Sequence, residues 1–312
     1  MSIDQKSSAD PVAFRTSFTA PSATKTNSIV EELQNRCPLC SATVLSIVLV
    51  GAARNVMKCS SCGVAFFCPR PPERELAHFF SEEYITTDED VEVRFGTRPE
   101  KSLLKVARFI HKRRAGGRIL DLGCAGGHFL DRYFRTSAWE KWGVELSKFA
   151  AARAMGKAIR MHVGDIHSAA LPAASFDVVT VLDTFYYFSE PRRELEAIRR
   201  ILKPDGLLVL VLTCATSHIW RNTGWMGRLS GRAQASFLES RHVFFYNPKA
   251  ITSVLRGSGF RVSSLQALPA NDQGNSLRNA LANGYFAMST VASHLSGARL
   301  MLGPRFLVAA SP

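Results

Sequence analysis

Short, mainly apolar runs, the weakest of them at residues 159–163, recur along the chain from about residue 118 and alternate with segments of helical periodicity. The runs occupy residues 118–122, 140–145, 159–163, 176–182 and 206–213. Continuous apolar runs of this length indicate strands that are buried on both faces, as in a parallel sheet covered by helices. Between the last two runs, Leu195, Ile198 and Leu202 form a helical stripe. Residues 260–262 and 305–309 add a candidate closing pair of strands, so residues 116–312 are predicted to form one α/β domain.

The segments before and inside this domain predict further organisation. Residues 1–30 are rich in Ser, Thr, Ala and Pro and predict a disordered tail, whereas residues 31–72 contain paired cysteines and end in a proline-rich stretch. Residues 73–115 begin with charged residues just after a proline and predict a helical linker. Two segments are insertions that a minimal domain of this kind does not need. Residues 215–241 are expected to cover the acceptor, and residues 270–304 are expected to form a lid, a dimer surface or a shallow membrane contact.

Four of the seven cysteines fall into two Cys-x-x-Cys pairs, which are Cys37/Cys40 and Cys59/Cys62. Each pair aims two sulfur atoms at one point, and two such pairs complete a closed tetrahedral site for zinc. The absence of an apolar leader segment favours a reducing, cytoplasmic location, where metal binding is more common than disulfide formation. The sequence therefore predicts a small zinc ribbon whose Zn²⁺ is structural.

A glycine-rich loop follows the first apolar run, where a strand turns into a helix. It reads Asp121-Leu122-Gly123-Cys124-Ala125-Gly126-Gly127. Glycines at such a turn let the backbone bend sharply and let a ligand approach it closely. The dinucleotide fingerprint requires Gly at positions 125 and 128, which hold Ala125 and His128, and the Lys-Ser/Thr of a phosphate-binding loop is missing.

Acidic residues end the next strands. Glu145 ends the second run and can accept hydrogen bonds from both hydroxyls of a ribose. Asp165 follows the third run and can accept from an adenine amine, while Ile166 can pack on the ring. Asp183 ends the fourth run and is expected to lie beside the same ligand. Because the carboxyl ends of parallel strands meet at one edge of a sheet, these side chains are expected to lie together with Asp121.

This combination resembles the class I S-adenosylmethionine-dependent methyltransferases, whose glycine motif reads Asp-x-Gly-x-Gly-x-Gly. Asp121, Gly123 and Gly127 match the motif, and Ala125 replaces its middle glycine beside Gly126. The similarity continues through Leu171-Pro172, Phe176-Asp177-Val178-Val179 and Leu202-Lys203-Pro204-Asp205-Gly206. The resemblance implies a Rossmann-like, seven-stranded sheet and S-adenosyl-L-methionine as the cofactor.

The resemblance, which covers residues 100–265, also implies which residues hold each part of the cofactor. It implies that loop 123–127 holds the methionine part, Glu145 the ribose, and Asp165 and Ile166 the adenine. With its preceding ribbon, the chain is similar to a bacterial group that methylates cell-surface sugars and secondary metabolites. The sugar C-methyltransferases of that group carry a further C-terminal domain that this chain is too short to contain. Transfer to an oxygen of a sugar, glycolipid or related small molecule is therefore expected.

The candidate catalytic residues lie after the fourth and fifth apolar runs. Many relatives carry a histidine shortly after the fourth strand, where this sequence has Tyr186 and Tyr187, which either line an acceptor pocket or belong to the core. His242 matches a second histidine of the family and follows Arg241. A neutral imidazole can accept a proton near pH 7, so His242 is predicted to take the acceptor's proton or to orient its hydroxyl, with the tyrosines as rivals.

Charge leaves a second class of acceptor open. The 312 residues carry a formal net charge of +13, and the sequence pI is about 9.7, a balance that suits nucleic acid, an anionic surface or a phosphorylated substrate. An RNA methyltransferase that uses the ribbon and the basic surface to hold rRNA is thus the alternative. A non-catalytic protein that retains the methyltransferase fold is disfavoured, because Asp121, Glu145 and Asp165 are all present. No apolar run is long enough to span a membrane, and the sequence leaves the oligomeric state open.

Overall fold

The computed structural model describes residues 36–90, 101–217, 219, 237–238, 240–269, 284, 286–291, 295–296 and 303–312. The predicted tail at residues 1–30 and most of the two predicted insertions, 215–241 and 270–304, lie outside the described residues. No helix in the described part of the chain is both long and apolar enough to cross a membrane.

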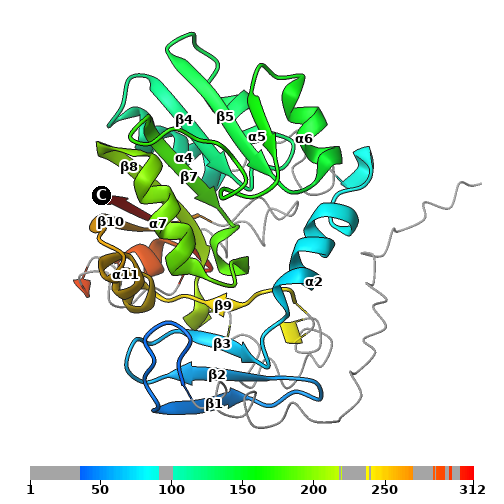
Figure 1. Ribbon diagram of the computed structural model, residues 1–312. Coiled ribbons are helices and arrows are strands. Elements are labelled where there is room, and N and C mark those ends of the chain that lie inside the picture. Colours follow the sequence, from blue (N-terminus) through cyan, green and yellow to red (C-terminus); the bar gives the residue numbers. More distant parts are fainter. Residues whose placement is uncertain are drawn as a thin grey trace, which may run out of the picture.

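A seven-stranded sheet forms the larger part of the protein (Figure 1). Its strands are β4 (Gly117–Leu122), β5 (Trp139–Glu145), β6 (Arg160–Val163), β7 (Phe176–Leu182), β8 (Leu202–Thr213), β10 (Arg261–Leu268) and β11 (Arg305–Ser311). The order is β10-β11-β8-β7-β4-β5-β6, with β11 antiparallel to both neighbours and the other pairs parallel. The predicted α/β, Rossmann-like architecture with seven strands is confirmed.

Helices cover both faces of this sheet (Figure 1). They are α4 (Lys101–His111), α5 (His128–Tyr133) and α6 (Lys148–Met155) on one face, and α7 (Pro191–Ile201) and α11 (Pro248–Gly257) on the other. Neighbouring strand residues point to opposite faces, so Ile119 packs with the first group and Leu120 with the second. Burial on both faces explains the mainly apolar runs of the central strands β4, β7 and β8. The expectation of burial is wrong for β6, which lies at the edge of the sheet and has no buried residue.

A four-stranded antiparallel sheet lies beside the large one and contains the paired cysteines (Figure 1). Its strands are β1 (Leu45–Leu49), β2 (Asn55–Cys59), β3 (Ala65–Cys68) and β9 (Phe244–Phe245), in that order. The sequence analysis predicted the ribbon from its paired cysteines but did not predict β9, which comes from far along the chain and pairs with Ala65 and Phe66 of β3. The small sheet is thus built from two separate parts of the chain.

Specific hydrogen bonds fix the small sheet to the large domain. Arg192, at the start of α7, donates from Nε and Nη2 to the carbonyl oxygen of Leu39, at 3.1 and 2.8 Å. Asn247, which caps α11, donates from Nδ2 to the carbonyl oxygen of Gly63 at 3.0 Å. Both contacts reach the turns that carry the cysteine pairs. Val64 shares a hydrophobic core with α7 and α11, so the two sheets pack through a continuous interior.

Candidate active site

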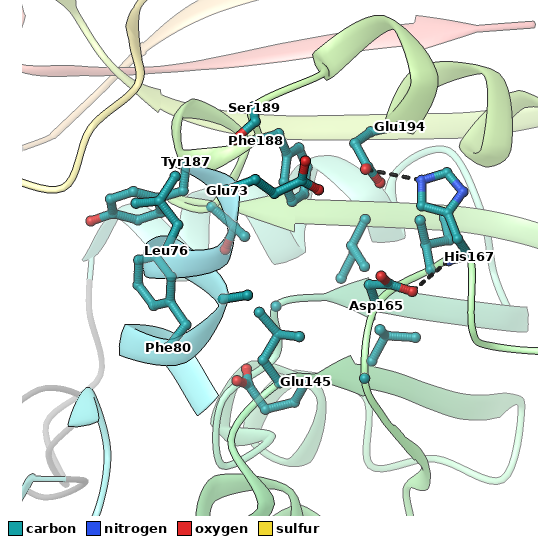
Figure 2. A pocket seen from close by; sticks show the side chains of 18 of the residues that line it. Glu73, Leu76, Phe80, Glu145, Asp165, His167, Tyr187, Phe188, Ser189 and Glu194 are labelled. Carbon is teal, nitrogen blue, oxygen red and sulfur yellow. Dashed lines mark hydrogen bonds and ion pairs between the residues drawn. The ribbon is translucent and has the colours of Figure 1, made fainter. Parts of the chain in front are cut away.

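A cavity of about 240 Å³ opens at the carboxyl ends of the parallel strands (Figure 2). Six of the eight predicted cofactor residues line it, namely Gly123, Ala125, Glu145, Asp165, Ile166 and Asp183. They come from the ends of β4, β5, β6 and β7, as expected when neighbouring parallel strands all end at one edge. Of the two others, Asp121 lines an adjoining cavity. Gly127 is the N-cap residue of α5 and lines neither of these two cavities.

The glycine-rich loop adopts the left-handed backbone that its sequence predicts. Gly123, Ala125 and Gly127 have φ angles of 76°, 47° and 69°. Gly126 is not among the residues with positive φ, so it does not stand in for the missing middle glycine, and Ala125 takes the left-handed conformation itself. This conformation costs a residue with a side chain about 1–2 kcal/mol. The N–H of Ala125 donates to Oε2 of Glu145 at 2.8 Å, a bond that holds the loop in place.

Glu145 therefore supports the cavity as well as lining it. Its second oxygen, Oε1, accepts the N–H of Ser147 at 2.9 Å, and the residue is only 8% exposed. Burial raises the pKa of this carboxyl, although the hydrogen bonds from Ser147 and Ala125 oppose the rise. Each carboxylate oxygen can accept more than one donor, so a ligand's hydroxyls can add to these bonds.

Asp121 is buried beneath the glycine-rich loop. Its Oδ1 accepts the hydroxyl of Thr180 at 2.6 Å. Burial raises the pKa of Asp121 to about 7, the Thr180 hydrogen bond lowers it, and the nearby charge of Glu145 raises it further. A carboxyl with this pKa changes charge near neutral pH, unlike an exposed aspartate.

We expect Asp121→Asn to remove a pH dependence of stability. The ordinary pKa of Asp is about 3.9, so between about pH 4 and pH 7 the folded state binds more protons at Asp121 than the unfolded state does. Stability then falls as pH rises through this window, by at most about 1.4 kcal/mol per pH unit. In thermal melting without cofactor, the melting temperature of the variant should rise relative to that of the wild type between pH 5 and pH 7. Parallel melting profiles across this range would contradict the assignment.

The loop after β6 shapes the far end of the cavity. Oδ1 of Asp165 accepts the backbone N–H groups of His167 at 3.0 Å and Ser168 at 2.7 Å. Burial alone would raise the pKa of Asp165, but the backbone and side-chain hydrogen bonds from Ser168, together with the charge and the backbone N–H of His167, outweigh it and lower the pKa. Asp165 is thus held as a carboxylate facing the cavity, as Figure 2 shows.

A second cavity of about 400 Å³ meets the first. The residues that line both are Tyr84, Gly123, Ala125, Leu182 and Asp183. The rest of its wall is rich in rings and cations and includes His128, Phe129, Arg132, Tyr133, Tyr186 and Arg305. Asp183, which has a positive φ of 53°, forms an ion pair with Arg305 from β11. No local pattern indicated this pair, because the two residues are far apart along the chain.

The three predicted catalytic residues form one aromatic cluster. His242 stacks on Tyr186, with ring centroids 4.4 Å apart, and lies 5.2 Å from the ring of Tyr187. Tyr187 lines the first cavity and packs on Phe80 at 4.7 Å, whereas Tyr186 lines the second. His242 is not among the residues that line either cavity. The cluster therefore presents its tyrosines to the cavities and keeps the imidazole behind them.

One wall of the first cavity comes from a segment that the sequence pattern predicted only as a linker. Helix α2 (Glu73–His78) and the π-helical turn η1 (Phe79–Glu83) run from the small sheet to the cavity (Figures 1 and 2). Glu73, Leu76, Ala77, Phe80 and Tyr84 line it. The four-residue spacing of Leu76, Phe80 and Tyr84 is the helical signal that could have revealed this face.

The four paired cysteines come together in the small sheet. The sulfur atoms of Cys37, Cys40, Cys59 and Cys62 all lie within 4.8 Å of one another. Those of Cys37 and Cys62 are 3.7 Å apart, and those of Cys40 and Cys59 are 3.5 Å apart. A disulfide requires about 2.05 Å, whereas thiolates around a tetrahedral Zn²⁺ with bonds of about 2.3 Å stand roughly 3.8 Å apart. The cluster thus has a geometry suited to a four-coordinate metal ion.

The fold and the cavity at its strand ends define a domain of the class I S-adenosylmethionine-dependent methyltransferases. A profile of the methyltransferase-domain family matches residues 96–265, which is more than half of the chain, and the chain belongs to this family. Among solved structures, a phosphoethanolamine N-methyltransferase from Haemonchus contortus in complex with S-adenosyl-L-methionine has the same fold. Its TM-score is 0.51 at 17% identity, over 76% of this chain and 59% of that one.

Curated relatives match part of the chain. A ubiquinone biosynthesis O-methyltransferase of Paraburkholderia phymatum is 30% identical over 31% of this chain and 44% of its own length. A 27-O-demethylrifamycin SV methyltransferase of Amycolatopsis mediterranei is 30% identical over 31% and 39%. A tRNA U34 carboxymethyltransferase of Methylococcus capsulatus is 27% identical over 48% and 47%. The chain spans less than half of the length of each of these three relatives.

Proposed function

We propose that this protein transfers the methyl group of S-adenosylmethionine to an oxygen atom of a sugar, a glycolipid or a related small metabolite. The observation that carries the proposal is the junction of the two cavities at Gly123, Leu182 and Asp183. One cavity has the acidic strand ends suited to an adenosine cofactor, and the other offers a separate chamber for an acceptor. Methyl transfer requires such an arrangement, because the acceptor atom must stand in line with the methyl group.

The cofactor placement follows from the lining of the first cavity. We assign the methionine part to loop 123–127, the ribose to Glu145, and the adenine to Asp165 and Ile166. Asp183 stands where the two cavities meet, beside the reacting end of the cofactor. When bound, the cofactor supplies an electrophilic methyl group on its sulfonium. The protein's own residues hold the two molecules in line and exclude water.

The second cavity supports an acceptor with both ring and hydroxyl character. Its wall combines phenol rings, such as Tyr133 and Tyr186, with the hydrogen-bond donors His128 and Arg132. Aromatic rings pack on the apolar faces of sugar rings or of other cyclic metabolites, while the polar groups bond to their hydroxyls. Two of the curated relatives carry names that refer to methylation of small molecules.

The acceptor class can be tested with S-adenosylmethionine carrying a radioactive methyl group. The purified full chain is incubated with separate fractions of sugar nucleotides, glycolipids, other small metabolites and total RNA. We expect ribonuclease-resistant label in a small-molecule or lipid fraction, and an alkali-stable ether in the product. Label in RNA would contradict the proposal in favour of the alternative. RNA binding that weakens steeply with salt would support that alternative as well.

We further propose that the cysteine cluster binds one structural Zn²⁺ through Cys37, Cys40, Cys59 and Cys62. Four sulfur ligands close the coordination sphere, so the ion has no position left for a substrate. Metal binding of this kind contributes about 10–16 kcal/mol in zinc-finger peptides, enough to order a sheet too small to fold by its own core. The ribbon would thereby hold α2 and β9 in place beside the cavities.

The proposed catalytic group consists of Tyr187, Tyr186 and His242. Tyr187 lines the cofactor cavity, and its ring lies 4.7 Å from that of Tyr186, which lines the second cavity. We therefore place the Tyr187 hydroxyl between the cofactor and the acceptor. Burial raises the pKa of Tyr186 well above its usual value, which keeps that phenol protonated and able to donate a hydrogen bond. His242 stacks on the ring of Tyr186 and contacts that of Tyr187 at a tilt, so it orients both rings and remains the rival as proton acceptor.

We expect Tyr187→Phe to slow turnover by about 10²- to 10⁴-fold, the usual contribution of a positioned acid or base. The change removes one hydroxyl and preserves the ring that packs on Phe80. Affinity for S-adenosylhomocysteine, measured by calorimetry, should stay within about twofold of the wild type. His242→Ala is the companion variant. If it is slow while Tyr187→Phe turns over normally, the role belongs to the histidine. If neither is slow, the acceptor needs no protein base.

A further inference from the structure

His167 and Glu194 join two walls of the cofactor cavity. Nε2 of His167 lies 2.9 Å from Oε1 of Glu194, and the two side chains are 24% and 15% exposed. His167 belongs to the loop after β6, whereas Glu194 lies in the first turn of α7. Both line the cavity, and Figure 2 shows the pair close to Asp165. The contact thus closes the end of the cavity to which adenine is assigned.

Only part of Asp165 is left for a ligand. Its Oδ1 already accepts two N–H groups from its own loop, those of His167 and Ser168. The Ser168 side chain also interacts with this carboxyl, but both backbone hydrogen bonds from the loop go to Oδ1 and neither goes to Oδ2. Because the loop fixes the direction of the carboxylate, Oδ2 is a fixed acceptor at this end of the cavity.

Glu194 offers a second acceptor in the same place. His167 engages Oε1, and within the described part of the chain no hydrogen-bond donor reaches Oε2. Burial raises the pKa of Glu194, and the hydrogen bond and charge of His167 only partly offset that effect. A carboxylate held in such surroundings is stabilised by an additional N–H donor from a ligand. The adenine ring carries such a donor in its 6-amino group.

We propose that Glu194, held in position by His167, accepts a hydrogen bond from the 6-amino group of the cofactor's adenine and so determines base specificity together with Asp165. The proposal rests on the cofactor placement under the proposed function. A base that carries a 6-carbonyl oxygen in place of the amine would present lone pairs to two carboxylates. A site built to accept from an amine rejects such an analogue, because its own acceptors are then left unpaired.

Paired titrations of the full chain with S-adenosylhomocysteine and S-inosylhomocysteine test this role. We expect the wild type to bind the adenine compound at least tenfold more tightly. In Glu194→Gln, the amide can donate to the 6-carbonyl oxygen, so the ratio of the two affinities should fall at least tenfold. A purely structural role would weaken both ligands equally and leave the ratio unchanged. His167→Gln, which removes the imidazole beside Glu194, should lower the ratio by a smaller factor.

The matched control is Glu196→Gln, which makes the same change at an exposed position of the same helix. Its ratio should equal that of the wild type, and thermal melting should show that all three variants are folded. A wild-type ratio retained in both Glu194→Gln and His167→Gln, with normal binding of S-adenosylhomocysteine, would overturn this proposal alone. Failure of the wild-type protein to bind S-adenosylhomocysteine would overturn the cofactor placement and this proposal with it.

Discussion

Glu145→Ala should bind S-adenosylhomocysteine about 10²- to 10⁴-fold more weakly than the wild type. In the proposed placement, Glu145 accepts two ribose hydroxyls, and hydrogen bonds to a charged acceptor contribute about 1.5–3 kcal/mol each. The substitution also removes the acceptor for the N–H of Ala125, which lies in the left-handed turn of the glycine-rich loop. Both effects act on the same ligand, so the loss is expected to be large. Calorimetry at one salt concentration measures it.

The control for this experiment lies on the same strand. Glu140, also in β5, pairs with Arg118 and Arg160 on the surface and lines neither the cofactor cavity nor the adjoining one. Glu140→Ala should bind S-adenosylhomocysteine within about twofold of the wild type. Glu145→Gln, which keeps the size of the side chain, separates the loss of charge from the loss of loop support. If Glu145→Ala binds S-adenosylhomocysteine as tightly as the wild type does, Glu145 does not contact the cofactor.

Cys59→Ser is expected to abolish metal binding and to loosen the small sheet. The wild type should contain one zinc per chain by elemental analysis, and the variant close to none, because a hydroxyl replaces one of four thiolates. Most of the roughly 10–16 kcal/mol that metal binding contributes to such modules would be lost. Hydrogen exchange should speed up in β1 to β3 and in β9, which pairs with β3. Strands β4, β7 and β8 should stay protected, since they form the centre of the large sheet.

Cys68→Ser is the matched control, because Cys68 ends β3 in the same sheet but is not part of the cluster. It should retain zinc and normal exchange. A purified wild-type protein that contains no metal and two disulfides would contradict the metal assignment. Normal exchange in β9 of a zinc-free Cys59→Ser protein would show that the ribbon does not depend on the ion.

The local signals in the sequence were sufficient for the sheet and for one wall of the site. Each buried parallel strand carries its own apolar run, and the residue at its end reaches the common edge whatever the rest of the chain does. For this reason the sequence alone was enough to place Glu145, Asp165 and Asp183 together. The left-handed turn at Gly123 was equally local, since glycine marks the position where the backbone needs it.

The other walls depend on contacts between distant segments, which no local pattern records. The pairing of Asp183 with Arg305 and of His167 with Glu194 joins separate elements. In the sequence, Arg305, His167 and Glu194 each look like an ordinary surface residue. The ring cluster presents a related difficulty. In the sequence, Tyr186 and Tyr187 can equally line a pocket or belong to the core, and only the packing of neighbouring elements decides which ring faces a cavity. The division of the chain into domains remains a prediction.

The pairing of β9 with β3 means that the ribbon cannot be lost or exchanged in evolution independently of the later segment that carries β9. Phe244 and Phe245 complete a sheet whose other three strands lie much earlier in the sequence. A descendant that lost those strands would keep two phenylalanines on an uncovered strand edge, where backbone groups invite other chains to pair and aggregate. Loss of the ribbon therefore has to be accompanied by changes in this later segment. The two coding regions are expected to evolve as a linked pair rather than as an exchangeable cassette.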